Sequence, residues 1–294
     1  YKPGVRRMSV MVGDDGRASI SHVPSSLDGH LYLTVNLWGV KARNSSLYDV
    51  DTVRAGRRLV AEIGMDDFRF LVQHDDKPRF AFGAAADSFD LSVFRRDDVQ
   101  GQWKEVTGSD KANLMPLAMS ADDSEFIASI AEAGGPRKLI RQSLADDKRV
   151  TLAEERIGSI DLVEWTAYPY VPFAAATAVG TPKLQYLDDS LPDAQLHRAL
   201  SAQFPGEYVH FTNFSLDGGK LIFLVDSDRD PGAYYLFDRA TRRATLLLQK
   251  RPWIAPEQMA ERRAVAFKAA DGAELHGYIM LPAPRADGAK PPLV

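Results

Sequence analysis

A polar turn followed by a short apolar strand recurs along this chain at a nearly constant interval, and such a period restricts the fold more than any other feature of the sequence. The turns contain Asp28, Asp75, Asp122 and Asp217; the copy at Asp217 is the clearest, whereas those at Asp75 and Asp122 lack glycine and are recognised by the spacing. The first two intervals are 47 residues each, and the third is 95 residues, which is about two periods. A further turn is therefore expected near residues 168–170, and the chain contains five repeating units.

A second strand is expected 15 to 20 residues after each turn. These strands fall at residues 46–50, 91–94, 138–141, 184–187 and 234–237. Short strands at this spacing, separated by Asp, Gly and Pro turns, are typical of a β-propeller in which each unit is one four-stranded blade. The sequence thus predicts an all-β fold, with five consecutive four-stranded antiparallel sheets over residues 25–250. Residues 1–20 are expected to belong to an earlier blade.

Composition excludes several classes of protein. The 294 residues are 45% apolar, which is enough for a substantial core, and 36 basic against 40 acidic side chains give a net charge of −4. Charges of both signs are interspersed, so neither a nucleic-acid partner nor a membrane-surface partner is expected. The chain has no cysteine, which excludes disulfides and thiol chemistry but leaves both a cytoplasmic and a periplasmic location open.

Two segments have the pattern of short helices. Residues 193–200 place Leu196, Ala199 and Leu200 on one face, and we interpret this helix as an insertion in the fourth unit. Residues 256–262 begin with proline at the favoured first helical position and carry an early acid, Glu257. We interpret this second segment as a connector between domains.

The sequence contains no recognisable catalytic, cofactor or metal motif. A serine hydrolase of the α/β type needs Gly-x-Ser-x-Gly, and no such run occurs. The six histidines have no metal-ligand spacing, and no glycine-rich phosphate loop is present. We therefore assign no catalytic residue, no metal ligand and no cofactor within these residues.

The acidic loop at residues 226–232 allows three interpretations. Its three carboxylates suggest calcium, but the loop lacks the acid and the flanking helices of an EF-hand. A solvated turn in which Arg229 pairs locally is favoured. A third interpretation places Arg229 in the central tunnel, where it binds a substrate carboxylate; Arg229 is the one candidate substrate-binding residue. The aromatic residues Trp165, Tyr168, Tyr170 and Phe173 are expected to pack in the blade core.

The last thirty residues contain a strong hairpin signal. Two apolar-rich strands, residues 264–267 and 275–281, are joined across Asp271-Gly272. Phe267, Asp271, Gly272, Leu275, Gly277, Tyr278 and Pro282 fill the pattern F-x-x-x-D-G-x-x-L-x-G-Y-x-x-x-P. With this pattern the chain resembles the prolyl oligopeptidase family of serine peptidases, above all the bacterial acylaminoacyl-peptidase and dipeptidyl-aminopeptidase-like branches.

The resemblance implies a domain organisation and an activity. Residues 1–252 would be a propeller, part of one with seven or eight blades and truncated at its N-terminus; a complete five-bladed propeller is the alternative. Residues 253–262 would be a linker, and residues 263–294 the first strands of an α/β-hydrolase domain, with a further strand opening at Leu293-Val294. The intact enzyme would hydrolyse short peptides, with the serine, histidine and aspartate of its triad all beyond Val294. Residues 1–294 alone would be inactive.

The same resemblance implies that the propeller takes no part in catalysis and acts as a gate and size filter over the active site. Its partners would be short peptide substrates and its own hydrolase domain, and exposed strands could also favour self-association. The alternative is a stand-alone propeller that serves as a protein-binding scaffold. That alternative explains the repeat equally well, but it does not explain the terminal hairpin.

Overall fold

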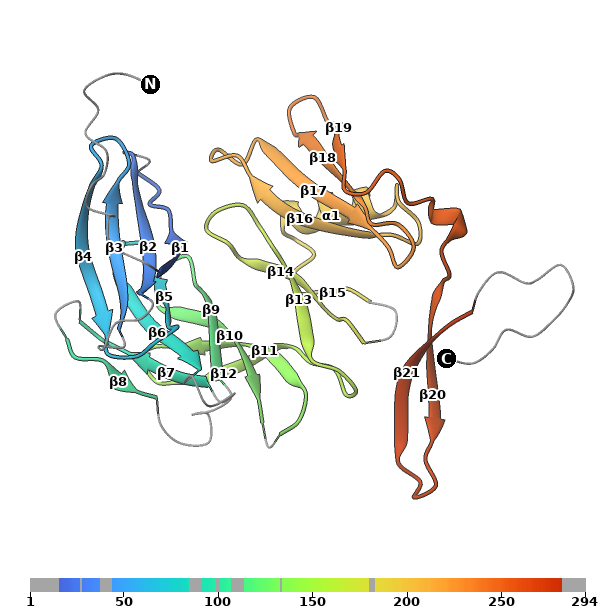
Figure 1. Cartoon of the computed structure of the whole chain (residues 1–294), viewed down its shortest axis with the longest axis horizontal. Coiled ribbons are helices and arrows are strands. Elements are labelled where there is room, and N and C mark those ends of the chain that lie inside the picture. The colour runs from blue at the N-terminus through green and yellow to red at the C-terminus, as the bar shows by residue number, and fades with distance from the viewer. Residues whose placement is uncertain are drawn as a thin grey trace, which may run out of the picture. The chain divides into compact units, whose positions relative to one another are not determined.

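The computed structural model describes residues 16–26, 28–37, 44–84, 91–98, 101–106, 114–132, 134–179 and 183–281 (Figure 1). The fold is all-β, as the turn spacing predicts, and antiparallel sheets follow one another along the chain. The chain divides into two compact units, residues 1–152 and 153–294.

The first unit contains three four-stranded sheets, each with its strands in sequence order. Their strands are β1 (Gly16–His22), β2 (His30–Leu37), β3 (Ser45–Asp51) and β4 (Gly56–Ile63); β5 (Arg69–Val72), β6 (Pro78–Ala84), β7 (Leu91–Arg95) and β8 (Lys104–Glu105); and β9 (Leu114–Met119), β10 (Glu125–Ala131), β11 (Arg137–Ser143) and β12 (Arg149–Ala153). Arg17 and Ile20 belong to β1 and pair with β2, so the expectation that residues 1–20 form part of an earlier blade is wrong for this segment.

The cores of this unit lie between sheets rather than within them. One cluster joins Leu47 and Ala61 of the first sheet to Phe70 of the second, and another joins Phe80 of the second sheet to Phe126 of the third. A single twisted sheet cannot bury both faces alone, so stacking of successive sheets supplies the hydrophobic stabilisation. Neighbouring sheets also contact each other through their first strands, β1 with β5 and β5 with β9.

Hydrogen-bonded side chains connect the same sheets. His22 Nε2 lies 2.9 Å from Asp76 Oδ1, and His74 Nδ1 lies 2.9 Å from Asp123 Oδ1. The backbone N–H of His74 also donates to the carboxylate of Asp123. Each aspartate lies in the turn after the first strand of its sheet, so these turns contact the preceding sheet as well as reversing the chain.

The second unit contains a three-stranded sheet, a helix, a four-stranded sheet and a separate hairpin. These elements are β13 (Ile160–Trp165), β14 (Pro172–Thr177), β15 (Gln185–Tyr186), α1 (Pro192–Ser201), β16 (Tyr208–Phe214), β17 (Lys220–Asp226), β18 (Ala233–Asp238), β19 (Arg243–Gln249), β20 (Arg262–Lys268) and β21 (Glu274–Met280). The apolar cluster of this unit again spans two sheets, with Phe173 of β14, Phe211 of β16 and Phe223 of β17.

The helix α1 confirms the helical pattern of residues 193–200, but it is not an insertion. It follows β15, at the position where the other units have a fourth strand. The repeat length hardly changes across the helix, because the turn residues Tyr170 and Gly218 on either side of it are 48 positions apart. Its buried face consists of Asp193, Ala194, His197 and Leu200, whereas Ala199 is exposed. The expected face is therefore rotated, because α1 packs on β14 and β16 through the side containing His197.

A positive φ marks the same turn position in all five units. It occurs at Gly29, Asp76, Asp123, Tyr170 and Gly218, with φ between 57° and 91°. The intervals between these residues are 47, 47, 47 and 48. Glycine adopts this conformation freely and aspartate tolerates it, whereas a tyrosine there is strained. The predicted period is confirmed, including the unit whose turn at residues 168–170 has neither Asp nor Gly.

The predicted terminal hairpin is confirmed. The strands β20 and β21 pair with Phe267 opposite Leu275, and Gly272 has a positive φ at the turn. The helical connector predicted for residues 256–262 is wrong in extent: only Pro256–Gln258 form a 3-10 turn, and Arg262 already lies in β20. The strand expected at Leu293-Val294 lies outside the described residues.

Candidate functional site

The first strands β13 and β16 of the second unit approach each other, as first strands do in the first unit. In a β-propeller, the first strands of the blades surround the central channel, where ligands commonly bind. Polar side chains on these strands are therefore the first place to look for a functional site.

Glu164 of β13 is completely buried, and three donors from β16 satisfy it. His210 Nδ1 lies 2.6 Å from Glu164 Oε1, and the Tyr208 hydroxyl donates to the same oxygen over 3.0 Å. The backbone N–H of Phe211 donates to Oε2 over 3.0 Å. Because an unpaired buried carboxylate is very unfavourable, these three bonds are required wherever Glu164 is ionised. We call Glu164, Tyr208 and His210 the inner-strand cluster.

The inner-strand cluster shifts the pKa values of Tyr208 and His210. The hydrogen bond to Glu164 raises the pKa of His210, although burial partly opposes this effect. Burial, reinforced by Glu164, raises the pKa of Tyr208 far above its usual value. Tyr208 therefore stays a phenol, and the raised pKa of His210 favours an imidazolium that faces a carboxylate. This arrangement holds a proton between two sheets and offers no nucleophile.

Two further carboxyl groups lie near the same end of β16. Burial raises the pKa of Asp226, which pairs with Tyr208 in the β16–β17 ladder, although Lys250 partly opposes the effect. Burial and the nearby charges of Asp230 and Asp226 also raise the pKa of Glu207. The surroundings of the inner-strand cluster are therefore acidic.

A second histidine resembles one half of a catalytic dyad but lacks the geometry. His197 Nδ1 lies 3.3 Å from Ser201 Oγ, within the same helix. The Tyr186 hydroxyl lies closer to Nδ1, at 2.9 Å, and Nε2 is bound to the carbonyl of Val209. Burial lowers the pKa of His197. Within the described part of the chain, no carboxylate is hydrogen-bonded to this imidazole, so it serves as a buried link between α1 and β16 rather than as a general base.

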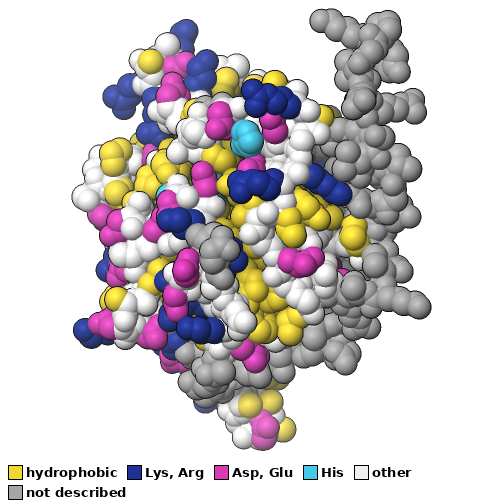
Figure 2. Space-filling model, turned by 90° about the vertical axis from the view of Figure 1, so that its left-hand side faces the viewer, with side chains coloured by type: hydrophobic (Ala, Val, Ile, Leu, Met, Phe, Trp, Pro, Cys, Tyr) yellow, Lys and Arg dark blue, Asp and Glu magenta, His cyan; other side chains and the backbone are white. Residues whose placement is uncertain are grey.

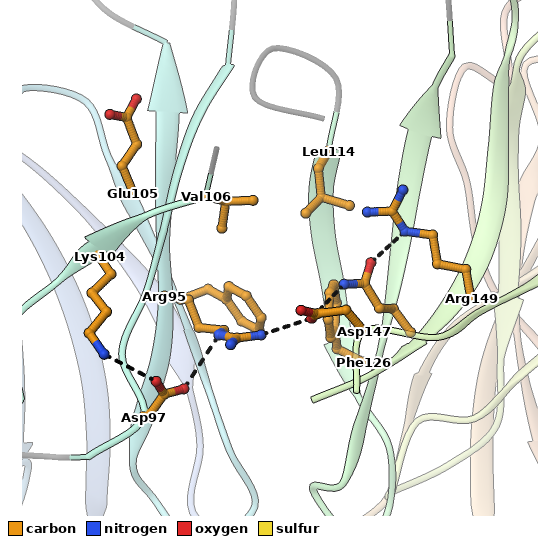
Figure 3. A pocket seen from close by; sticks show the side chains of 11 residues that line it. Arg95, Asp97, Lys104, Glu105, Val106, Leu114, Phe126, Asp147 and Arg149 are labelled. Carbon is orange, nitrogen blue, oxygen red and sulfur yellow. Dashed lines mark hydrogen bonds and ion pairs between the residues drawn. The ribbon is translucent and has the colours of Figure 1, made fainter. Parts of the chain in front are cut away.

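A cavity of about 340 Å³ lies between the second and third sheets of the first unit (Figure 3). Its base is apolar, with the rings of Phe80 and Phe126 4.7 Å apart. At its rim, Arg95 lies between Asp97 and Asp147 and forms ion pairs with both (Figure 3). Because these charges already satisfy one another across the two sheets, the rim links the sheets, and we assign no ligand to it.

Arg229 lies exposed in the loop between β17 and β18. Its guanidinium makes no ion pair with another residue that the structure describes, so the expected local pairing is absent. The loop is instead tied to the hairpin, because Asp228 Oδ2 accepts the backbone N–H of Arg262 over 2.5 Å. Since Asp226 pairs with Tyr208, the loop lies at the same end of its sheet as the inner-strand cluster.

Other site expectations can be placed as well. Phe173 is buried as expected, whereas Tyr168 and Tyr170 are exposed, because their strained turn protrudes from the sheet. Within the described ranges, no group of three or more His, Asp or Glu side chains is arranged to hold a metal ion. The same part of the chain contains no helix long and apolar enough to cross a membrane.

Sequence reasoning missed the inner-strand cluster. A signal was available: Glu164 is the one carboxylate between Asp161 and Asp188, and it lies in an otherwise apolar strand end. Tyr208 and His210 alternate with Val209 and Phe211, which places the two polar rings on one strand face. A buried acid predicts donors, but the sequence alone does not say on which strand they lie.

Sheets of four strands in sequence order, stacked through their first strands, define a β-propeller of the kind found in prolyl oligopeptidase-type peptidases. No protein-family model and no curated protein sequence matches the chain. Among solved structures, it is similar to prolyl oligopeptidase B from Galerina marginata, with a TM-score of 0.54 and 12% identity over 88% of this chain and 38% of that one. It is also similar to a puromycin hydrolase, with a TM-score of 0.51 and 16% identity over 92% of this chain and 43% of that one.

These similarities show the fold of the propeller portion of the peptidases. The chain spans about two fifths of the length of either protein. The fold expectation from the sequence is therefore confirmed for the propeller region.

Proposed function

We propose that this chain is the non-catalytic propeller part of a serine peptidase that hydrolyses short peptides, and that the propeller acts as a gate and size filter over the active site. The hairpin is the observation that carries this proposal. It fills the family pattern, and seven of its apolar side chains are exposed: Val265, Phe267, Leu275, Tyr278, Ile279, Met280 and Leu281. A two-stranded hairpin of this kind is only marginally stable alone, so it needs further strands beside it.

The hairpin is attached to the second unit by polar contacts rather than by a core. The Tyr278 hydroxyl donates to the carbonyl of Ala178 over 2.8 Å, and Arg156 pairs with Glu274. Its apolar faces thus stay available, which suits the first strands of an α/β-hydrolase sheet. This supports a boundary after residue 252, a linker to residue 262 and a second domain from residue 263.

The proposed enzyme class is the acylaminoacyl-peptidase or dipeptidyl-aminopeptidase type. In such an enzyme a serine attacks the peptide carbonyl, a histidine accepts its proton, and backbone amides stabilise the oxyanion. The exposed Arg229 is a candidate for contact with a substrate carboxylate. Prolyl oligopeptidase B, one of the similar structures, has been captured with a 35mer hydrolysis and macrocyclization substrate.

The test uses the complete product of the gene that encodes this chain. A fluorophosphonate probe should label one serine of that protein, and the chain of residues 1–294 should not be labelled. The complete protein should cleave a short chromogenic peptide but not the same peptide inserted into a folded domain. Failure of labelling would refute the peptidase assignment. Labelling with equal cleavage of both substrates would refute only the filter role.

A further inference from the structure

The outermost strand of the last four-stranded sheet, β19, is unusually exposed to solvent. Among the strands that the structure describes, β19 pairs only with β18, and all residues from Thr241 to Trp253 are exposed. Leu246, Leu247 and Leu248 are 50%, 48% and 53% exposed, and Trp253 is 77% exposed. Along the free edge of an outer strand, alternate residues direct their N–H and C=O groups outward, where another strand can pair with them.

The charge of this segment is also unusual. Residues 239–256 contain five basic side chains and no acidic one, in a chain whose net charge is −4. Arg239 pairs with Asp193, and Lys250 lies near Asp226. The remaining three, Arg242, Arg243 and Arg251, are exposed and make no ion pair with another residue in the described part of the chain. We call residues 239–253 the basic edge.

The other outer strands lack this combination. On β4, Arg58 pairs with Asp49, and Glu62 lies in the strand itself. β8 contains Glu105, and β12 is followed directly by Glu154 and Glu155. On the side of the molecule shown in Figure 2, acidic and basic side chains alternate over the surface. Among the outer strands that the structure describes, an unbalanced basic charge is therefore particular to β19.

We propose that the basic edge binds an extended acidic segment of a partner protein by strand addition to β19. The partner strand would have an apolar centre, which contacts Leu246 on one face of the sheet and Leu248 on the other, because the register shift between Tyr234 and Tyr235 separates these two leucines. It would have Asp or Glu at both ends, which pair with Arg242, Arg243 and Arg251. Main-chain hydrogen bonds supply much of the affinity in this binding mode, and side-chain contacts supply the specificity. This interaction goes beyond the proposed peptidase role, because it involves neither the hairpin nor a substrate.

Charge argues against a second copy of the chain as the occupant. An antiparallel pair of β19 strands would bring Arg242 and Arg243 of one copy next to Lys250 and Arg251 of the other. Like charges opposite each other destabilise a strand pair. Nucleic acid and anionic lipid would satisfy the arginines, but neither uses the free backbone groups of the edge.

The experiment measures binding of labelled probes by fluorescence polarisation. The first probe is a short peptide of alternating valine and threonine with paired aspartates at both ends, and its control has lysines in place of the aspartates. Arg243→Glu and Arg251→Glu should each lower the affinity for the acidic peptide about tenfold, which is the size expected when a contacting charge is reversed. Lys104→Glu on the outer strand β8 changes the net charge equally and should leave the affinity unchanged. Binding should also slow hydrogen exchange of the β19 amides.

The remaining outcomes overturn the proposal. Equal binding of the lysine-ended peptide, or an equal effect of Lys104→Glu, would show that the arginines do not select the ligand. Binding without protection of the β19 amides would exclude strand addition. Stronger binding of phosphatidylserine vesicles or of oligothymidylate than of the acidic peptide would assign the basic edge to a lipid surface or a nucleic acid instead.

Discussion

Polar contacts between neighbouring sheets differ in the two units of this chain. In residues 1–152, His74 and Asp123 meet near the surface, and the carboxylate keeps 17% of its side-chain area exposed. In residues 153–294, Glu164 is completely buried and receives three donors from β16. Both contacts link a carboxylate to a histidine, but only the second removes the carboxylate from water. Burial, rather than residue type, should therefore decide how much each contact contributes to stability.

The largest effect on the free energy of unfolding is expected from Glu164→Ala. The substitution leaves His210, Tyr208 and the Phe211 N–H without their acceptor, and loss of one partner from a buried ion pair costs about 3 kcal/mol or more. Urea unfolding at neutral pH, followed by tryptophan fluorescence, should show this loss in the free energy of unfolding. Glu164→Gln, which keeps an acceptor oxygen, should lose less. Equal losses in both variants would show that the carboxylate charge and its bonds are unimportant.

A smaller effect is expected from Asp123→Asn. Asparagine tolerates the positive φ of 57° at this position and keeps one acceptor, so the variant tests mainly the charge and the second bond to His74. The free energy of unfolding should fall by about 1 kcal/mol, the usual value for a partly exposed hydrogen bond. The comparison between the two units fails if this loss equals or exceeds that of Glu164→Ala in the same assay.

The pH dependence should differ between wild type and His210→Gln. Because the folded state raises the pKa of His210, the stability that its proton contributes is complete below the unfolded pKa of about 6.5 and is lost as pH rises through the folded pKa. The effect should be modest, since burial opposes the hydrogen bond. Thermal midpoints should fall from pH 6 to pH 9 in wild type and fall less in His210→Gln. Parallel profiles would show that His210 is not linked to folding.

Asp226 and Glu207 also contribute to the pH dependence, and their contribution begins at lower pH than that of His210. Their raised carboxyl pKa values mean that stability falls as pH rises from the unfolded values near 4 through the folded ones. Keeping the comparison at pH 6 and above therefore reduces their contribution to the His210 test.

The smallest effect is expected at Tyr170, whose φ of 62° is unfavourable for an aromatic residue. Tyr170→Asn should raise the free energy of unfolding by about 0.5 kcal/mol, because relief of the backbone strain exceeds the loss of the ring contact with Tyr168. Tyr170→Phe keeps both the strain and the ring, so its stability should match wild type. A loss of stability in Tyr170→Asn would mean that the tyrosine pair matters more than the turn.

The repeat was predictable because a turn between two strands needs one residue with positive φ, and Asp, Asn or Gly usually supplies it. This requirement identified the turns at Gly29 and Gly218. The turns at Asp76, Asp123 and Tyr170 contain no glycine, and only the spacing located them. The terminal hairpin was predictable for the same reason, since Asp271-Gly272 determines it locally.

The candidate site was much less predictable. The contacts of Glu164 join residues more than forty positions apart, and no local pattern specifies such a pair. The buried face of α1 differs from the predicted one because His197, a polar residue, is buried through its bonds to Tyr186 and Val209. The role of Arg229 in substrate binding remains a prediction, since the structure shows only an exposed loop residue.

The pairing of β20 with β21 has a mechanical consequence. Arg262, where the chain enters the hairpin, lies opposite Met280, where it leaves. A force that pulls these two ends apart acts on the hydrogen bonds of the ladder one pair at a time, because antiparallel bonds lie perpendicular to the strands. The hairpin would therefore unzip at low force rather than shear, and it would yield before the four-stranded sheets whose faces are packed against their neighbours.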